Sequence, residues 1–131
     1  MDLVLDASAA LYLAASEVGF DALGQHQLLG PPLLWSESTS AIHQSAWRGA
    51  ISPTLARRAL DAFMRAPIER RAPDDLLERA WLVADELGWA KTYDAEYVAL
   101  AQITGARLLT RDARLRRGAA RLVDSIGPLD L

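Results

Sequence analysis

The stretch "LVLDASAAL" (residues 3–11) decides the fold that this sequence predicts. It opens with three apolar residues, which suit a strand covered on both faces, as strands of parallel sheets are. Asp6 follows them directly, and a helix over Ser8–Ser16 is expected next, capped by its first residue. The stretch "LLTRDARL" (residues 108–115) repeats the pattern and places Asp112 shortly after a second apolar run. Two core strands are therefore followed by carboxylates, which are costly to bury.

Apolar periodicity and turn residues divide the rest of the chain into alternating strands and helices. Ser36 and Ser52 are candidate helix caps, the latter followed by Pro53, and Gly88 and Gly105 mark helix ends. We expect strands at 2–5, 31–35, 67–72, 107–110 and 122–126. We expect helices at 8–16, 20–26, 36–50, 52–66, 74–88, 92–105 and 112–120. This alternation indicates an α/β domain built on a parallel sheet, and 131 residues fit a single domain over 1–131.

Composition narrows the classes of protein that the chain fits. It is 51% hydrophobic and has no apolar run of the roughly 18–20 residues that cross a bilayer. It has no cysteine, which excludes disulfides, thiolate nucleophiles and cysteine zinc sites. An acid, Asp2, stands where a signal peptide has basic residues, so a cytoplasmic protein without a membrane partner is expected. The net charge of −3 argues against tight non-specific binding to a polyanion.

Four acids occupy comparable places in this series of elements. Asp6 and Asp112 follow apolar strands, Glu37 follows "LLW", and Asp94 lies in the first turn of an apolar helix. Any one of them is explained by the helix dipole, which an acid there stabilises by ~0.3–1 kcal/mol. Ligands of parallel sheets, however, bind beyond the carboxyl ends of the strands, where the strand order reverses. If all four meet there, they repel one another, and a divalent cation removes that repulsion.

At this point the chain resembles a known family. The motifs "LVLDASA", "WSES", "YDAEYVALA" and "LLTRDARL" stand in the order and at the spacing found in PIN-domain ribonucleases, and most resemble VapC-type toxins. The resemblance implies a PIN-like three-layer α/β/α sandwich with a short, mainly parallel central sheet. It maps all four acids onto catalytic, metal-binding positions and makes Ser8 and Thr110 supporting hydroxyls. Without it, Ser8 is explained as a helix cap and Thr110 as a strand residue.

The same resemblance implies a function. It predicts a metal-dependent endoribonuclease, the toxin of a type II toxin–antitoxin module, that hydrolyses RNA phosphodiester bonds. Asp6, Asp94 and Asp112 would hold one or two Mg²⁺ or Mn²⁺ ions, with Glu37 binding directly or through water. The implied partners are the RNA substrate, a VapB-like antitoxin and a second copy of the chain in a homodimer.

An acidic pocket repels RNA, so basic residues are expected around it. Arginines cluster near the last acid, at Arg111, Arg114, Arg116, Arg117 and Arg121. They are read either as phosphate contacts or as the solvated face of a helix with cations near its C-terminus. The tyrosines and tryptophans suit packing better than base stacking at their helical and strand-end positions.

Other classes fit less well. A receiver domain needs a lysine after a core strand, and the only lysine, Lys91, does not follow one. A haloacid-dehalogenase-type phosphatase needs an aspartate where Ser8 stands. No G-x-G-x-x-G or G-x-x-x-x-G-K-[ST] motif occurs, so phosphate binding by a glycine-rich loop is unsupported. The alternative that stays open is a non-catalytic PIN-like module that binds RNA or a protein partner.

Overall fold

A five-stranded sheet organises the chain in the computed structural model, which describes residues 1–131. Every neighbouring pair of strands is parallel. The strands are β1 (Asp2–Leu5), β2 (Gln27–Gly30), β3 (Ile68–Arg70), β4 (Arg107–Leu109) and β5 (Ser125–Ile126), in the order β3-β2-β1-β4-β5. Along the sequence the strands are added outward from β1 to β3, and β4 is then added on the other side of β1. The point where the strand order reverses therefore lies between β1 and β4.

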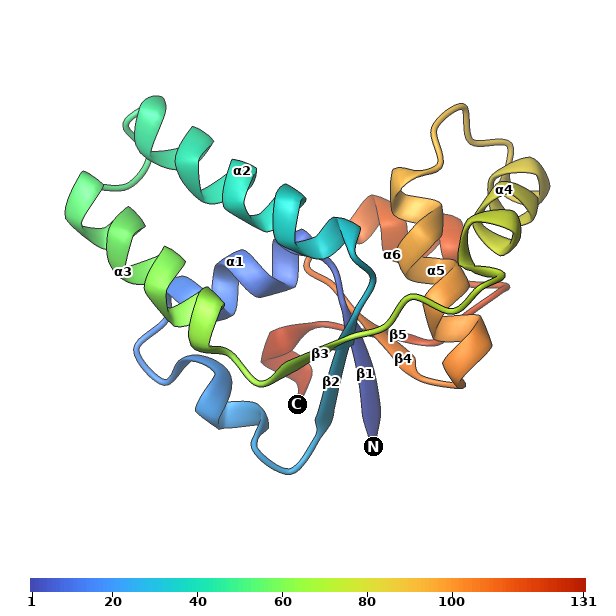
Figure 1. Cartoon of the computed structure of the whole chain (residues 1–131), viewed down its shortest axis with the longest axis horizontal. Helices are drawn as coiled ribbons and strands as arrows, with labels where there is room; N and C mark the ends of the chain where they lie inside the picture. The colour runs from blue at the N-terminus through green and yellow to red at the C-terminus, as the bar shows by residue number, and fades with distance from the viewer.

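Two groups of helices cover the sheet. The helices are α1 (Ala7–Ala15), α2 (Leu33–Trp47), α3 (Pro53–Arg65), α4 (Leu76–Leu87), α5 (Tyr93–Thr104) and α6 (Ala113–Ala119), with 3-10 turns η1 (Gly19–Leu23) and η2 (Pro128–Asp130). α1, α2 and α3 pack together on one side of the strands, and α4, α5 and α6 lie on the other (Figure 1). This arrangement confirms the predicted three-layer α/β/α sandwich. None of these helices combines the length and the apolar character that crossing a membrane requires.

The two central strands form the middle of the core. Leu3, Val4 and Leu5 of β1 have no exposed surface, and neither have Leu108 and Leu109 of β4. Burying each leucine contributes about 1.5–3 kcal/mol. Residues 95 and 97–101 of α5 are also fully or almost fully buried, whereas Glu96 between them is only partly buried. The apolar residues of the two strands that precede the aspartates are therefore completely buried.

The strand predicted at 31–35 is wrong. β2 ends at Gly30, and Leu33–Trp47 form α2, with Pro32 as its N-cap in helical backbone geometry. Proline has no N–H to donate to a sheet ladder but is tolerated where a helix begins. Residues 31–35 therefore lead into the helix, and the strand is formed by the short stretch "QLLG" before them. Ser36 consequently does not cap this helix, and Glu37 lies in its second turn.

Smaller differences concern the ends of elements. Ser8 is not the cap of α1, because Asp6 is the N-cap and its Oδ1 accepts a 3.0 Å bond from the Ala9 N–H. The helix predicted at 20–26 is the 3-10 turn η1, and the strand predicted at 122–126 is reduced to β5. The strand predicted at 67–72 is confirmed as the edge strand β3, although it is shorter.

Candidate metal centre

Asp6 and Asp112 emerge at the same edge of the sheet because their strands are neighbours. β1 and β4 pair in parallel, with Leu5 opposite Leu109. Asp6 follows β1 as the N-cap of α1, and Asp112 follows β4 as the N-cap of α6. Both acids thus lie just beyond the carboxyl ends of the strands, at the point where the strand order reverses.

Glu37 and Asp94 reach the same place from helices. α2 carries Glu37 in its second turn, and α5 carries Asp94 in its first. All four acids line one cavity of about 360 Å³. The remaining lining residues are Ala7, Ser8, Ser40, Ala41, Gln44 and Tyr97. The structure therefore brings together the four acids and Ser8, all of which the sequence singled out.

Asp6 is the most rigidly held of the four carboxylates. It is 5% exposed, and Ser8 Oγ donates a 2.7 Å bond to its Oδ1. Thr110 Oγ1 donates to Oδ2. Burial raises the pKa of Asp6, although the bonds from Thr110, the Ala9 N–H and Ser8 act in the opposite direction. Donors on both oxygens fix the plane of the carboxylate and favour its ionised form.

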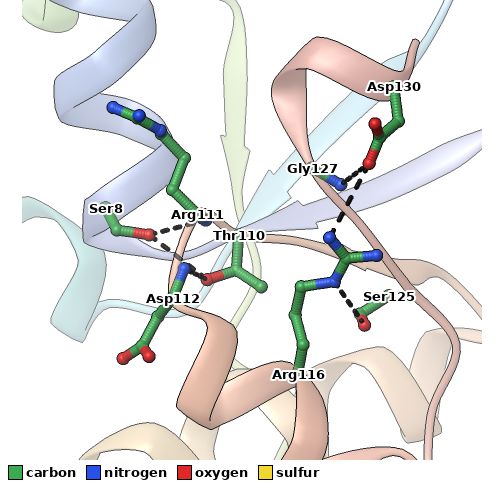
Figure 2. Close-up of polar contacts among 8 residues, drawn as sticks. All are labelled: Ser8, Thr110, Arg111, Asp112, Arg116, Ser125, Gly127 and Asp130. Atoms are coloured by element: carbon green, nitrogen blue, oxygen red, sulfur yellow. Dashed lines mark hydrogen bonds and ion pairs between the residues drawn. The ribbon is translucent and has the colours of Figure 1, made fainter.

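The same hydroxyls tie the loop after β4 to the start of α1 (Figure 2). The Arg111 N–H donates a 2.9 Å bond to Ser8 Oγ, and the Asp112 N–H donates a 3.0 Å bond to Thr110 Oγ1. Oδ1 of Asp112 in turn accepts the N–H groups of Arg114 and Leu115 at 2.9 and 3.2 Å. Ser8 and Thr110 therefore hold Asp6 and position the segment that carries Asp112.

Glu37 is held by a residue that sequence reasoning assigned only to packing. Tyr97, which is 1% exposed, donates a 2.6 Å bond from its hydroxyl to Glu37 Oε1. Burial raises the pKa of Glu37, the Tyr97 bond lowers it, and the nearby Asp94 and Asp6 charges raise it. The signal for Tyr97 was its spacing, because residues three apart share one face of a helix and Tyr97 follows Asp94 by three.

No basic side chain neutralises the four acids. The two ion pairs of the structure are Arg71–Glu69 and Arg116–Asp130, both elsewhere. Burial and the Asp112 charge raise the pKa of Asp94, and the Arg114 charge lowers it. A fifth acid, Glu96 on α5, has its pKa raised by burial and then by Glu37. The cavity therefore holds repelling negative charge that a cation would stabilise.

The residues fit a hydrated divalent cation better than a closed cage. No group of three or more His, Cys, Asp or Glu side chains stands close enough together to hold a metal ion directly. Mg²⁺ in proteins usually keeps several waters and is bound through one or two carboxylates. A cavity of about 360 Å³ lined by four uncompensated carboxylates offers hard oxygen ligands together with room for those waters.

The arginines near the last acid take separate positions. Arg111 stacks its guanidinium on the Tyr12 ring, 4.4 Å from the centroid. Arg116 donates to Ser125 Oγ at 3.3 Å and pairs with Asp130 at 3.7 Å, at the C-terminal end of the chain (Figure 2). Arg121 donates to the Glu86 carbonyl, and Arg117 is exposed on α6. Arg114 alone among these side chains lines a cavity together with Asp94 and Asp112.

The structure thus belongs to the class of all-parallel α/β/α sandwiches that gather acids where the strand order reverses. Comparison with known proteins identifies its family. The family model "PIN domain" matches residues 3–121. The chain belongs to the PIN domain family.

Curated relatives and solved structures also resemble this chain over most of its length. Ribonuclease VapC9 of Mycobacterium tuberculosis is 34% identical over 114 residues, which cover 86% of this chain and 87% of that protein. The crystal structure of PAE2754 from Pyrobaculum aerophilum has a TM-score of 0.75 and 29% identity, covering 97% of this chain and 89% of that one. VapBC2 from Rickettsia felis, bound to a DNA fragment from its promoter, shares the fold at TM-score 0.68 and 14% identity, covering 97% and 98%.

Proposed function

We propose that this protein is a metal-dependent endoribonuclease and the toxin of a type II toxin–antitoxin module. The observation that carries the proposal is the cavity where Asp6, Glu37, Asp94 and Asp112 meet without any basic partner. Family membership supports it, because a relative that covers most of the chain is named a VapC ribonuclease.

Each acid has a part that follows from how it is held. Asp6, with donors on both oxygens, is the rigid ligand of the site. Asp112 has its Oδ1 engaged by backbone N–H groups, which orients the carboxylate and leaves Oδ2 for the cation. Asp94 faces the same cavity from α5. Glu37, oriented by Tyr97, binds the cation directly or through water.

The reaction is hydrolysis of a phosphodiester. Water adds to phosphorus, one P–O ester bond breaks, and the leaving oxygen receives a proton. One or two Mg²⁺ or Mn²⁺ ions supply activation of the water and neutralisation of the charge that develops on the phosphoryl oxygens. The four carboxylates would hold the ions, in part through water, and Ser8, Thr110 and Tyr97 keep two of those carboxylates oriented. Neither histidine is needed, and His43 lies exposed on α2 away from this cavity.

The proposed partners follow from the same assignment. The Rickettsia felis structural neighbour is a VapBC complex. On the basis of family membership, we infer that this chain also binds a VapB-like antitoxin. A homodimer, a cytoplasmic location and a single domain over residues 1–131 belong to the same proposal. Co-purification with the product of an adjacent small gene tests the antitoxin, light scattering tests the homodimer, and fractionation tests the location.

The decisive experiment compares the wild type with Asp94→Asn on structured RNA in Mg²⁺, in Mn²⁺ and in EDTA. We expect cleavage by the wild type that needs metal, and none by Asp94→Asn. Asp85→Asn removes an acid from the exposed side of α4 and serves as the matched control, with full activity expected. Equal cleavage by the wild type and Asp94→Asn would contradict the site. Tight RNA binding without cleavage by any form would favour the non-catalytic module.

A further inference from the structure

A second cavity lies on the other side of Asp94 and Asp112. Its volume is about 410 Å³, and these two acids line it as well as the first cavity. Its other walls come from the loop between α4 and α5 and from α6. They consist of Gly88, Trp89, Ala90, Lys91, Arg114 and Leu115. Asp94 and Asp112 therefore form a partition between two adjoining cavities.

The two cavities differ in charge. The first is lined by four acids and no base, whereas the second adds Lys91 and Arg114 to the two shared acids. Both basic residues are exposed, and neither takes part in an ion pair. Arg114 lines the second cavity together with Asp94 and Asp112 and forms an ion pair with neither of them. Two free cations thus stand directly beside the anionic pocket.

The apolar wall of the second cavity is fixed in place. The Trp89 N–H donates a 2.8 Å bond to the Ala84 carbonyl as the chain leaves α4 through Gly88, whose φ is +71°. The indole lies against α6 at Gly118, where an added Cβ would stand 3.1 Å from Cζ2 of Trp89. Glycine at position 118 therefore allows this close approach. The loop that carries Lys91 is anchored beside α6 by this contact.

We propose that the second cavity is a subsite for the phosphate that neighbours the scissile bond of the RNA strand. Lys91 and Arg114 contact that phosphate, and Trp89 forms the wall along which the attached nucleoside lies. The proposal rests on the ribonuclease function argued above and extends it to how the strand is placed.

The chemistry of the two cavities favours this placement. An anionic strand can approach four carboxylates only where cations offset their charge, and the basic side chains that share a cavity with the acids are Lys91 and Arg114. Successive phosphates of one strand lie on either side of a nucleoside, so a strand whose scissile phosphate sits in the first cavity passes over the partition into the second. Contacts to phosphate carry no sequence information, and this subsite therefore sets position and affinity rather than base preference.

A binding experiment tests the subsite without requiring cleavage. Fluorescence anisotropy measures the affinity of single-stranded oligoribonucleotides in Ca²⁺, with their integrity checked on a gel, over a range of salt. Lys91→Gln combined with Arg114→Gln should flatten the slope of log K against log[salt] by about 0.7, since both side chains contact one phosphate and each neutralised phosphate of a single strand contributes about 0.7. The loss of affinity should be the same for oligonucleotides of different sequence. Arg57→Gln, on the exposed side of α3, is the matched control and should leave the slope unchanged.

A cleavage experiment then places the contact on the strand. Phosphates flanking the cut are replaced one at a time by neutral methylphosphonates. One replacement should slow cleavage by the wild type roughly tenfold and leave cleavage by the double variant almost unaffected. The reason is that the methylphosphonate and the double substitution remove the same charge contact. An unchanged salt slope, or a double variant as sensitive as the wild type to every replacement, would overturn the subsite. If the wild type binds RNA but never cuts it, the ribonuclease proposal fails, while the salt slope still decides whether Lys91 and Arg114 hold phosphate.

Discussion

The hydroxyl of Tyr97 donates a 2.6 Å hydrogen bond to Oε1 of Glu37 and so joins α5 to α2 across the candidate metal centre. The ring is almost fully buried, so its position is set by the core rather than by the site. Glu37 is half-buried and is repelled by Asp94 and Asp6. The bond therefore holds a carboxylate close to charges from which it would otherwise turn away.

Tyr97→Phe removes that bond and preserves the ring. We expect a loss of about 2 kcal/mol in the free energy of unfolding, since the bond is made to a charged group. The pKa of Glu37 should rise further, so the acid limb of the pH–activity profile should move to higher pH. Urea denaturation and the activity profile measure the two effects. Tyr93→Phe, at an exposed position on the same helix, should change neither; an unaltered profile in Tyr97→Phe would show that the bond does not tune Glu37.

Glu37→Gln should stabilise the metal-free protein at neutral pH while abolishing cleavage. The pKa of Glu37 in the folded state is raised above its ordinary 4.5. Below pH 4.5 the group is protonated in both states, and as pH rises through the folded pKa the folded state must carry a disfavoured charge. The stability of the wild type relative to Glu37→Gln should therefore fall with rising pH. Thermal unfolding in EDTA at several pH values measures this, and a constant difference would contradict it.

Thr110→Val tests the support of Asp6. Thr110 is fully buried and donates to Asp6 Oδ2, so the substitution keeps the shape and leaves the carboxylate one donor short. We expect a loss of about 1–3 kcal/mol in stability. Weaker Mg²⁺ binding, measured by calorimetry, should accompany it because the carboxylate is less firmly oriented. Thr110→Ser retains the hydroxyl and should recover most of the metal affinity; equal affinities in both variants would assign Thr110 to packing alone.

Mg²⁺ or Mn²⁺ should stabilise the folded protein because the ion binds the folded cavity and not the unfolded chain. At a free concentration about 100 times Kd the gain is about 2.7 kcal/mol. Thermal unfolding with and without EDTA measures it. Asp94→Asn should lose most of the gain and Asp85→Asn should keep it. The same shift in all three proteins would place the ion outside the cavity.

The sequence by itself determined the central strands and the acids that follow them. Residues 3–5 and 108–109 are apolar on both faces, and only a sheet covered on both sides buries such runs. Asp94 in the first turn of an apolar helix was equally readable. The strand at 31–35 was misplaced because a four-residue strand with two leucines, Gln27–Gly30, has almost no periodicity, whereas "PPLLW" contains more apolar residues.

Tertiary structure alone decided which groups meet. That Asp6 and Asp112 share an edge depends on β1 and β4 being neighbours, a pairing between residues about a hundred positions apart that local pattern does not encode. The bond from Tyr97 to Glu37, and the cavity shared by Lys91 and Arg114, depend on how helices pack across the sheet. Local sequence preferences act over a few residues. Hydrogen bonds and charge interactions in a site act over a few ångströms, and only folding brings residues that are far apart in the sequence that close in space.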